Sequence, residues 1–215
     1  MLPDPEILHP ITRPDGKPHL GTVHLTVALD HPRIEVGRWT YASAHAPPED
    51  WAAALAPYLY PFSAERLWIG AFCQIADGVR FVTSSANHAM DGASCYPFAV
   101  FDAARRSGFQ PDTRDTVVGN DVWIGTGALI CPGAQIGDGV VIGAGAVVRG
   151  IVPDYAIVAG NPAKVMRMRI EPDDAARLKR IAWWNWPRAR IDAAIPALKA
   201  GDITALETLG SGRAR

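Results

Sequence analysis

Cysteine is scarce in this chain of 215 residues, and the few cysteines present form no framework. Cys73, Cys95 and Cys131 are odd in number, and their spacing is that of neither a zinc knuckle nor a disulfide scaffold. We therefore expect three free thiols. The stability of the fold then has to come from apolar packing, for which a chain that is 48% apolar is well supplied.

The sequence also lacks an excess of charge of either sign and any long apolar run. Lys plus Arg number 21 and Asp plus Glu number 22, so no net field draws the chain toward nucleic acid or an anionic membrane. No stretch approaches the roughly 18 consecutive apolar residues of a membrane span. The N-terminus, MLPDPEILHP, mixes prolines and acids where a signal peptide needs a basic start and an apolar run. We expect a cytoplasmic protein.

What the sequence does have is a strict six-residue period. From Val118, every sixth position is aliphatic: Val118, Ile124, Ile130, Ile136, Ile142 and Val148. The position four later in each hexad is also apolar: Val122, Ala128, Ala134, Val140, Ala146 and Val152. An α-helix turns position i+6 well away from position i, and hairpins need turn signals every 8 to 12 residues or so. The period predicts a prism of short parallel strands, three hexads per coil, with both tracks pointing inward.

Glycine follows the aliphatic residue in four of these six hexads, at Gly119, Gly125, Gly137 and Gly143. Glycine accepts a positive φ at a sharp corner without steric cost. We therefore expect these four glycines to be the turning points of the prism.

The period divides the chain into three parts. An earlier piece of it contains Ile69, Ile75 and Phe81, with Cys73 on the small-residue track and therefore expected in the core. A weaker trace covers 34–39. We assign an N-terminal segment to 1–33, a β-helix domain to 34–170 and a helical segment to 171–215. Two excursions, 38–67 and 82–117, break the period, and loops that leave a rigid scaffold are where functional sites tend to lie.

The pattern changes to a helical one at EPDDAARLKRIAWWNWP. Pro172 and the acids after it are typical of a first helical turn, and Pro187 stops the run. A second, weaker helix follows in RARIDAAIPALKAG and is expected to kink at Pro196. We expect the tryptophans of this segment to pack the helix and not to line a ligand site: Trp183, Trp184 and Trp186.

Four motifs occur in one order: the hexads with VGNDVWIG, the loop SSANHAMDGASCYPF, the turn GNPAKV and the tail WWNWP. Together they closely resemble the xenobiotic acetyltransferases, a hexapeptide-repeat family that includes the chloramphenicol and streptogramin A acetyltransferases. The match runs from about residue 34 to 187. The resemblance implies a mainly β fold, a left-handed parallel β-helix. It also implies a homotrimer with active sites between subunits, and transfer of acetyl from acetyl-CoA to a hydroxyl.

The resemblance places the general base at His88 of the ANH segment. An alcohol needs a base to remove its proton as it attacks a thioester, and histidine suits that role near neutral pH. A histidine that only caps its own loop is the structural alternative. Asp91 is interpreted as a loop-forming residue, with a role in orienting the imidazole as the alternative. Cys95 offers a rival mechanism through an acetyl-thiol intermediate, although the resemblance favours direct transfer.

The family also implies where the two substrates bind. The CoA groove would run along the coils near Trp123, Thr126 and Ala144, with Lys164 and Arg167 as cations for its phosphates. The acceptor tyrosine of the family corresponds to Tyr41, and Tyr96 either shapes the same pocket or anchors its loop. We expect no metal, because five of the six histidines precede residue 46 and the repeats supply no zinc ligands of the kind a β-helix carbonic anhydrase uses.

Two other functions stay open at this point. The acceptor could be a sugar or natural-product hydroxyl in place of a xenobiotic such as chloramphenicol or streptogramin A. A non-catalytic β-helix scaffold is the other alternative, although a scaffold has no reason to combine the histidine loop with the CoA-type turn.

Overall fold

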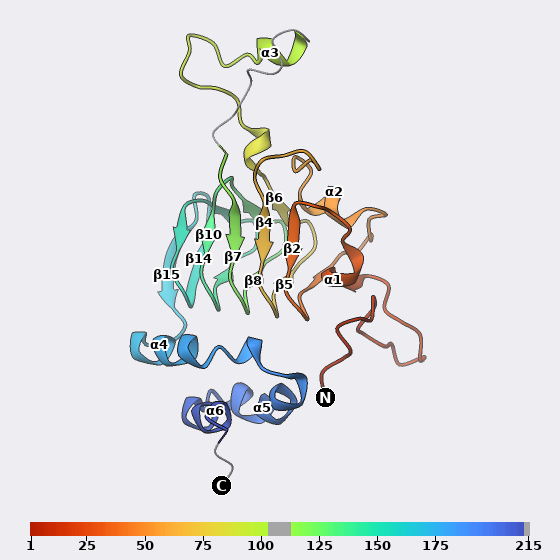
Figure 1. Ribbon diagram of the computed structural model, residues 1–215, viewed down its shortest axis with the longest axis vertical. Coiled ribbons are helices and arrows are strands. Elements are labelled where there is room, and N and C mark those ends of the chain that lie inside the picture. Colours follow the sequence, from red (N-terminus) through yellow and green to blue (C-terminus); the bar gives the residue numbers. More distant parts are fainter. Residues whose placement is uncertain (103–112, 213–215) are drawn as a thin grey trace.

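The computed structural model describes residues 1–102 and 113–212, and its centre is a three-sided prism of short strands (Figure 1). Residues 103–112 of the expected second excursion and 213–215 of the tail lie outside the described residues. Each side of the prism is one sheet, and the strands follow one another from side to side along the chain. The arrangement fits the left-handed parallel β-helix expected from the sequence.

The first sheet contains five parallel strands: β2 (Ile34–Val36), β4 (Leu67–Ile69), β7 (Thr116–Val118), β10 (Gln135–Ile136) and β13 (Ile151–Val152). The third sheet contains three: β6 (Arg80–Phe81), β9 (Leu129–Ile130) and β12 (Val147–Val148). The second sheet is β1 (Thr22–His24), β3 (Tyr41–Ser43), β5 (Gln74–Ile75), β8 (Trp123–Ile124), β11 (Val141–Ile142), β14 (Ala156–Ala159) and β15 (Lys164–Met168). Only its two edge strands, β1 and β15, run antiparallel to their neighbours.

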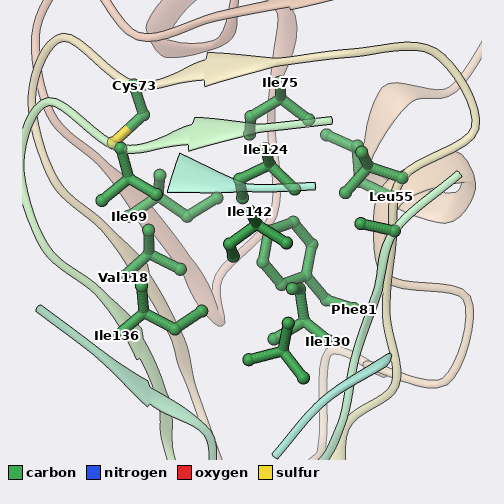
Figure 2. Close-up of a cluster of buried hydrophobic side chains, with 14 of the residues drawn as sticks. Leu55, Ile69, Cys73, Ile75, Phe81, Val118, Ile124, Ile130, Ile136 and Ile142 are labelled. Carbon is green, nitrogen blue, oxygen red and sulfur yellow. The ribbon is translucent and has the colours of Figure 1, made fainter. Parts of the chain in front are cut away.

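The strand register confirms three hexads per coil. Val118 pairs with Ile136, and Ile124 with Ile142, so each aliphatic residue stacks on the one a full coil later. All six residues of the aliphatic track are at most 3% exposed, and Figure 2 shows Ile75, Ile124 and Ile142 stacked in the core. Each contributes roughly 1.5 to 3 kcal/mol by its burial. Cys73 is fully buried here as expected, and burial raises the pKa of its thiol to about 12.

The glycines that follow the aliphatic residues are not the turning points that we expected. None of the four has a positive φ; at the corner after β8, that conformation belongs to Gly127, and at the next coil to Gly145. Gly125 is needed for a different reason, because a Cβ there would lie 2.7 Å from the amide nitrogen of Ala144. The expectation was therefore wrong about the cause, since this glycine lets successive coils approach closely.

The first excursion starts later than the sequence suggested. Residues 41–43 form β3 within the second sheet, so the chain leaves the prism after Ser43 and not at Arg38. Helix α2 (Trp51–Leu55) lies in this excursion, and Leu55 reaches the core near Phe81 (Figure 2). The second excursion begins after β6 and ends at β7, which already starts at Thr116. It includes the 3₁₀ turn η1 (Ser84–Ala86) and helix α3 (Phe98–Phe101).

The C-terminal segment consists of α4 (Pro172–Ile181), the 3₁₀ turn η3 (Trp183–Asn185), α5 (Arg188–Ala200) and α6 (Ile203–Gly210). Helix α5 continues through Pro196, and α6 was not expected from the sequence. In Figure 1 the helices lie below the ends of the first-sheet strands, at the corner that leads into the second sheet. There Phe72 stacks on Trp39 at 4.9 Å and contacts Trp183 at 4.7 Å. We call this edge of the prism the first corner.

Short helix α1 (Leu25–Ala28) follows β1, and the N-terminal residues before it run along the second sheet. The indole nitrogen of Trp39 donates to the carbonyl of Pro3 at 2.9 Å, and the amide of His24 donates to the carbonyl of Leu8 at 2.9 Å. These bonds fix residues 3–8, which we call the N-terminal arm, against the first corner. The sequence had assigned no structure to this arm.

Candidate active site

The loop that carries His88 leaves the prism between β6 and β7, at the corner from the third sheet to the first. Its base is tied down by short hydrogen bonds. The amide of Ser85 donates to a carboxylate oxygen of Glu65 at 2.6 Å, and the Ser85 hydroxyl lies 2.7 Å from that of Ser63. Both partners belong to the first excursion, so each excursion supports the other.

The imidazole of His88 is exposed, and its Nδ1 lies 3.1 Å from the carbonyl oxygen of Cys95. A carbonyl only accepts hydrogen bonds, so Nδ1 carries the proton of the neutral ring and Nε2 presents a lone pair outward. The group that orients the imidazole is thus a backbone carbonyl, which no side-chain pattern reveals. Asp91 is exposed in the same loop, and neither a hydrogen bond nor an ion pair joins it to His88 among the described residues.

The tip of this loop presents apolar side chains to solvent. Met90 is 83% exposed and Phe101 is 71% exposed. Tyr96 packs on Phe98 and Phe101 at ring distances of 4.7 and 5.4 Å, so within one chain it anchors its own loop. A clustered apolar surface of this kind is typical of a protein interface.

A cavity of about 440 Å³ lies between the first corner and the N-terminal residues Leu2, Pro3, Pro10 and Ile11. Its walls are mostly apolar and include the aromatic rings of Trp39, Tyr41, Phe72 and Trp183. Tyr41 is half-buried there, and burial raises the pKa of its hydroxyl. The expectation for the tail holds for Trp184 and Trp186, which are buried in packing, whereas Trp183 also lines this cavity.

His88 and Tyr41 do not meet within one chain. The cavity around Tyr41 opens at the first corner, beside the C-terminal helices, and its lining does not include His88. The loop between β6 and α3 extends from the opposite side of the prism, at the top of Figure 1. His45, a further polar candidate, is exposed and does not line the cavity either.

The residues expected to bind CoA form one exposed strip along the prism. Thr126 and Ala144 occupy the same corner one coil apart, where the amide of Gly145 donates to the carbonyl of Thr126 at 2.8 Å. Trp123 lies exposed on β8 just before that corner. The small side chains of Thr126 and Ala144 leave the backbone of this corner accessible, which suits the close approach of an extended pantetheine chain.

Lys164 and Arg167 lie on β15, the edge strand beyond β14. Lys164 pairs with Ala159 and Arg167 with Ile157, so both are carried on the second sheet, as Trp123 is. Both side chains are exposed. Two exposed cations therefore lie on the same sheet as Trp123, separated from β8 by β11 and β14.

Comparison with known proteins identifies the family. Residues 115–150 match the family described as bacterial transferase hexapeptide (six repeats). A chloramphenicol acetyltransferase of Agrobacterium fabrum is 41% identical over 192 residues, which cover 86% of this chain and 90% of that protein. The chain belongs to the xenobiotic acetyltransferases. It is therefore an acetyl-CoA-dependent acyltransferase built on hexapeptide repeats.

Two further proteins are similar to this xenobiotic acetyltransferase. The virginiamycin A acetyltransferase of Staphylococcus aureus is 36% identical over 212 residues, covering 95% of this chain and 92% of its own. A solved maltose O-acetyltransferase from Clostridium difficile is 30% identical and covers 65% of this chain and 60% of its own, with a TM-score of 0.43.

Residues 1–102 and 113–212 contain neither a membrane-spanning helix nor a cluster of metal ligands. None of the helices there is both long and apolar enough to cross a membrane. In the same part of the chain, no group of three or more His, Cys, Asp or Glu side chains is placed to hold a metal ion.

The sequence had pointed to Tyr41 but not to the polar groups around it. Thr22, His24, Gln74 and Asp121 also line the cavity, and burial raises the pKa of the Asp121 carboxyl. Thr22 and His24 belong to β1, which pairs antiparallel with β3 and lies outside the six-residue repeat. No period marks such a strand.

Proposed function

We propose that the protein transfers acetyl from acetyl-CoA to a hydroxyl of a small xenobiotic acceptor of the chloramphenicol or streptogramin A type, with His88 as the general base. The observation that carries this is the hydrogen bond from His88 Nδ1 to the Cys95 carbonyl, because it leaves Nε2 free to accept a proton. Acetyl-CoA supplies the acetyl group as a thioester.

His88 handles the proton in both halves of the reaction. Its Nε2 takes the proton of the acceptor hydroxyl as the oxygen bonds to the thioester carbon. The resulting imidazolium returns this proton to the sulfur as the carbon–sulfur bond breaks, so acetylated acceptor and CoA thiol leave a neutral histidine. The fixed Nδ1–H keeps the ring in one tautomer throughout.

We further propose that the working site lies between two copies in a homotrimer. The cavity around Tyr41 binds the acceptor, and the loop of a neighbouring copy brings His88 to it, because the two lie on opposite sides of one chain. The exposed apolar tip, with Met90 and Phe101, would be covered by that neighbour. Closed cyclic symmetry lets each copy give one loop and one cavity.

The experiment that tests the proposed function is a thiol-release assay. Purified protein is mixed with acetyl-CoA and, in turn, chloramphenicol, a group A streptogramin and a panel of sugars. We expect acceptor-dependent thiol release well above the hydrolysis background with chloramphenicol or the streptogramin. Release with sugars alone would contradict the acceptor class, and release with none of them would contradict the function.

Co-assembly of two inactive variants tests whether the site is shared. We expect His88→Ala and Tyr41→Ala homotrimers each to be nearly inactive. When the two are co-expressed at equal levels, about a quarter of the sites combine an intact loop with an intact cavity from different copies. Activity should therefore return to about that fraction of wild type, measured by thiol release. A co-assembled sample as inactive as its parents contradicts a site between copies.

Removal of the two proposed phosphate contacts should weaken CoA binding. We expect Lys164→Ala and Arg167→Ala each to raise the KM for acetyl-CoA about 2- to 5-fold, the size of an exposed charge contact. The affinity that remains in the double variant should depend less on salt than that of wild type. Lys199→Ala, an exposed cation on α5, serves as the control and should leave KM unchanged. A double variant with the wild-type KM and the wild-type salt dependence would show that neither residue contacts CoA.

A further inference from the structure

His24 occupies a position next to Tyr41 that the family resemblance did not mark. It lies on β1 and pairs directly with Tyr41 across the antiparallel ladder. Its side chain is only 2% exposed, yet it lines the aromatic cavity under the N-terminal arm. A buried histidine at the wall of an apolar cavity needs hydrogen-bond partners for both ring nitrogens.

One of those nitrogens is satisfied by the N-terminal arm. His24 Nδ1 lies 2.9 Å from the carbonyl oxygen of Ile7, which can only accept, so Nδ1 carries the proton. Burial lowers the pKa of His24, while the Ile7 carbonyl and Asp4 oppose that shift. The ring is therefore neutral near pH 7, and its Nε2 is a lone-pair acceptor.

The second nitrogen has no partner among the residues that the structure describes. Two other polar side chains of the cavity, Thr22 and Gln74, are bonded to protein groups. The Thr22 hydroxyl lies 2.9 Å from that of Ser43, and Gln74 donates to the carbonyl of Phe72. His24 Nε2 is thus an acceptor without a protein partner in the wall of a cavity that Tyr41 also lines.

A purely structural role explains only half of this arrangement. Holding the arm accounts for the Nδ1 bond to Ile7, and the backbone amide of His24 adds a bond to Leu8. Neither bond uses Nε2. An asparagine could make the same bond to the arm without placing an acceptor where Nε2 lies.

We infer that His24 is a specificity-determining residue, whose Nε2 accepts a hydrogen bond from a second donor group, a hydroxyl or an amide N–H, on the acceptor molecule. The substrate class is then an alcohol with a flat apolar part and a hydrogen-bond donor apart from the reacting hydroxyl. The flat part packs among Trp39, Phe72 and Trp183. The inference rests on the proposed function, since it assigns the cavity to the acceptor.

Two substitutions separate the two nitrogens of His24. In His24→Asn, the side-chain amide reaches the place of Nδ1 and keeps the bond to Ile7, but nothing replaces Nε2. In His24→Gln, the longer side chain puts its oxygen near the place of Nε2 and gives up the bond to the arm. With chloramphenicol, we expect His24→Asn to raise the acceptor KM roughly tenfold, the usual cost of leaving one polar partner unpaired. His24→Gln should stay within about threefold of wild type.

Analogues of the acceptor complete the test. Chloramphenicol offers a second hydroxyl and an amide N–H, so we use one analogue without that hydroxyl and one with the amide nitrogen methylated. For the analogue that lacks the donor read by His24, wild type and His24→Asn should have the same KM. The KM for acetyl-CoA should not change in any variant. The Kd for chloramphenicol alone, measured by calorimetric titration, should change in parallel with the acceptor KM.

The outcomes distinguish the inference from the proposed function. If wild type acetylates chloramphenicol but His24→Asn shows the wild-type KM, or is less impaired than His24→Gln, then His24 only holds the arm and the inference fails. If wild type releases no thiol with chloramphenicol, a streptogramin or the sugars, the proposed function fails, and the inference falls with it.

Discussion

A His88→Ala protein is expected to fold normally and to lose about 10² to 10⁴ in kcat, the usual contribution of a positioned general base. The side chain is exposed at the tip region of a loop, and its one described hydrogen bond is to the Cys95 carbonyl. Its removal therefore costs little stability, and circular dichroism and the melting temperature should match wild type. The KM for acetyl-CoA should also stay constant, because the residues proposed to bind CoA lie on β8, on β15 and at the corners after β8 and β11.

The matched control for this loss is Asp91→Ala, in the same loop and equally exposed. We expect it to retain most of the wild-type kcat, because the Cys95 carbonyl already orients the imidazole. A folded His88→Ala protein with near-wild-type kcat would contradict the assignment of the base. Mass spectrometry of the protein with acetyl-CoA alone should find no acetyl group on Cys95; a stable acetylated Cys95 would instead favour transfer through the thiol.

The prism could be predicted from the sequence because its physical cause is strictly periodic. A coil of three hexads places positions 118 and 136 on top of one another, and only apolar side chains can fill the interior at each step. The pattern of burial along β7 to β13 is therefore already contained in the residue types. The same argument put Cys73 in the core, where the structure has it.

The cavity could not be predicted, because it is assembled from segments without a period. The arm is held by backbone carbonyls, with that of Pro3 accepting from Trp39 and that of Ile7 from His24, and any residue supplies a carbonyl. The same limit applies to His88, whose orienting partner is the carbonyl of Cys95. From the sequence, Asp91 is interpreted as a loop-forming residue, and its carboxylate is only the alternative partner of the imidazole. A main-chain acceptor leaves no mark in the residue types.

The glycines show that a correct pattern can have another cause than the one first assigned to it. Gly125 and Gly127 lie two residues apart in one corner, yet they meet different constraints. Gly125 has an ordinary φ and no room for a Cβ, whereas Gly127 has a φ of +67° and nothing within 4 Å of a Cβ. Both kinds recur with the six-residue period: a positive φ is found at Gly127, Gly133, Gly139 and Gly145, and close approach of the next coil at Gly119, Gly125 and Gly137.

The two glycines therefore make a matched pair for stability. In Gly125→Ala, the methyl group would lie 2.7 Å from the Ala144 amide nitrogen and 2.8 Å from the Ile142 carbonyl oxygen. Both are backbone atoms of the next coil, and that carbonyl also accepts the amide of Gly125 at 2.8 Å, so neither can move without separating β8 from β11. We expect a loss of about 3 kcal/mol in the free energy of unfolding, at the upper end for overpacking.

Gly127→Ala should cost less, about 1 to 2 kcal/mol, because its methyl group meets open space and only the left-handed backbone conformation is penalised. Urea unfolding of wild type and both variants at one protein concentration measures the difference, provided that the m-value is unchanged. The larger loss in Gly125→Ala follows from coil-to-coil contact. If Gly127→Ala is instead the more destabilising variant, the positive φ at the corner is the stronger requirement for glycine. Our original interpretation of the glycines would then apply to Gly127 and not to Gly125.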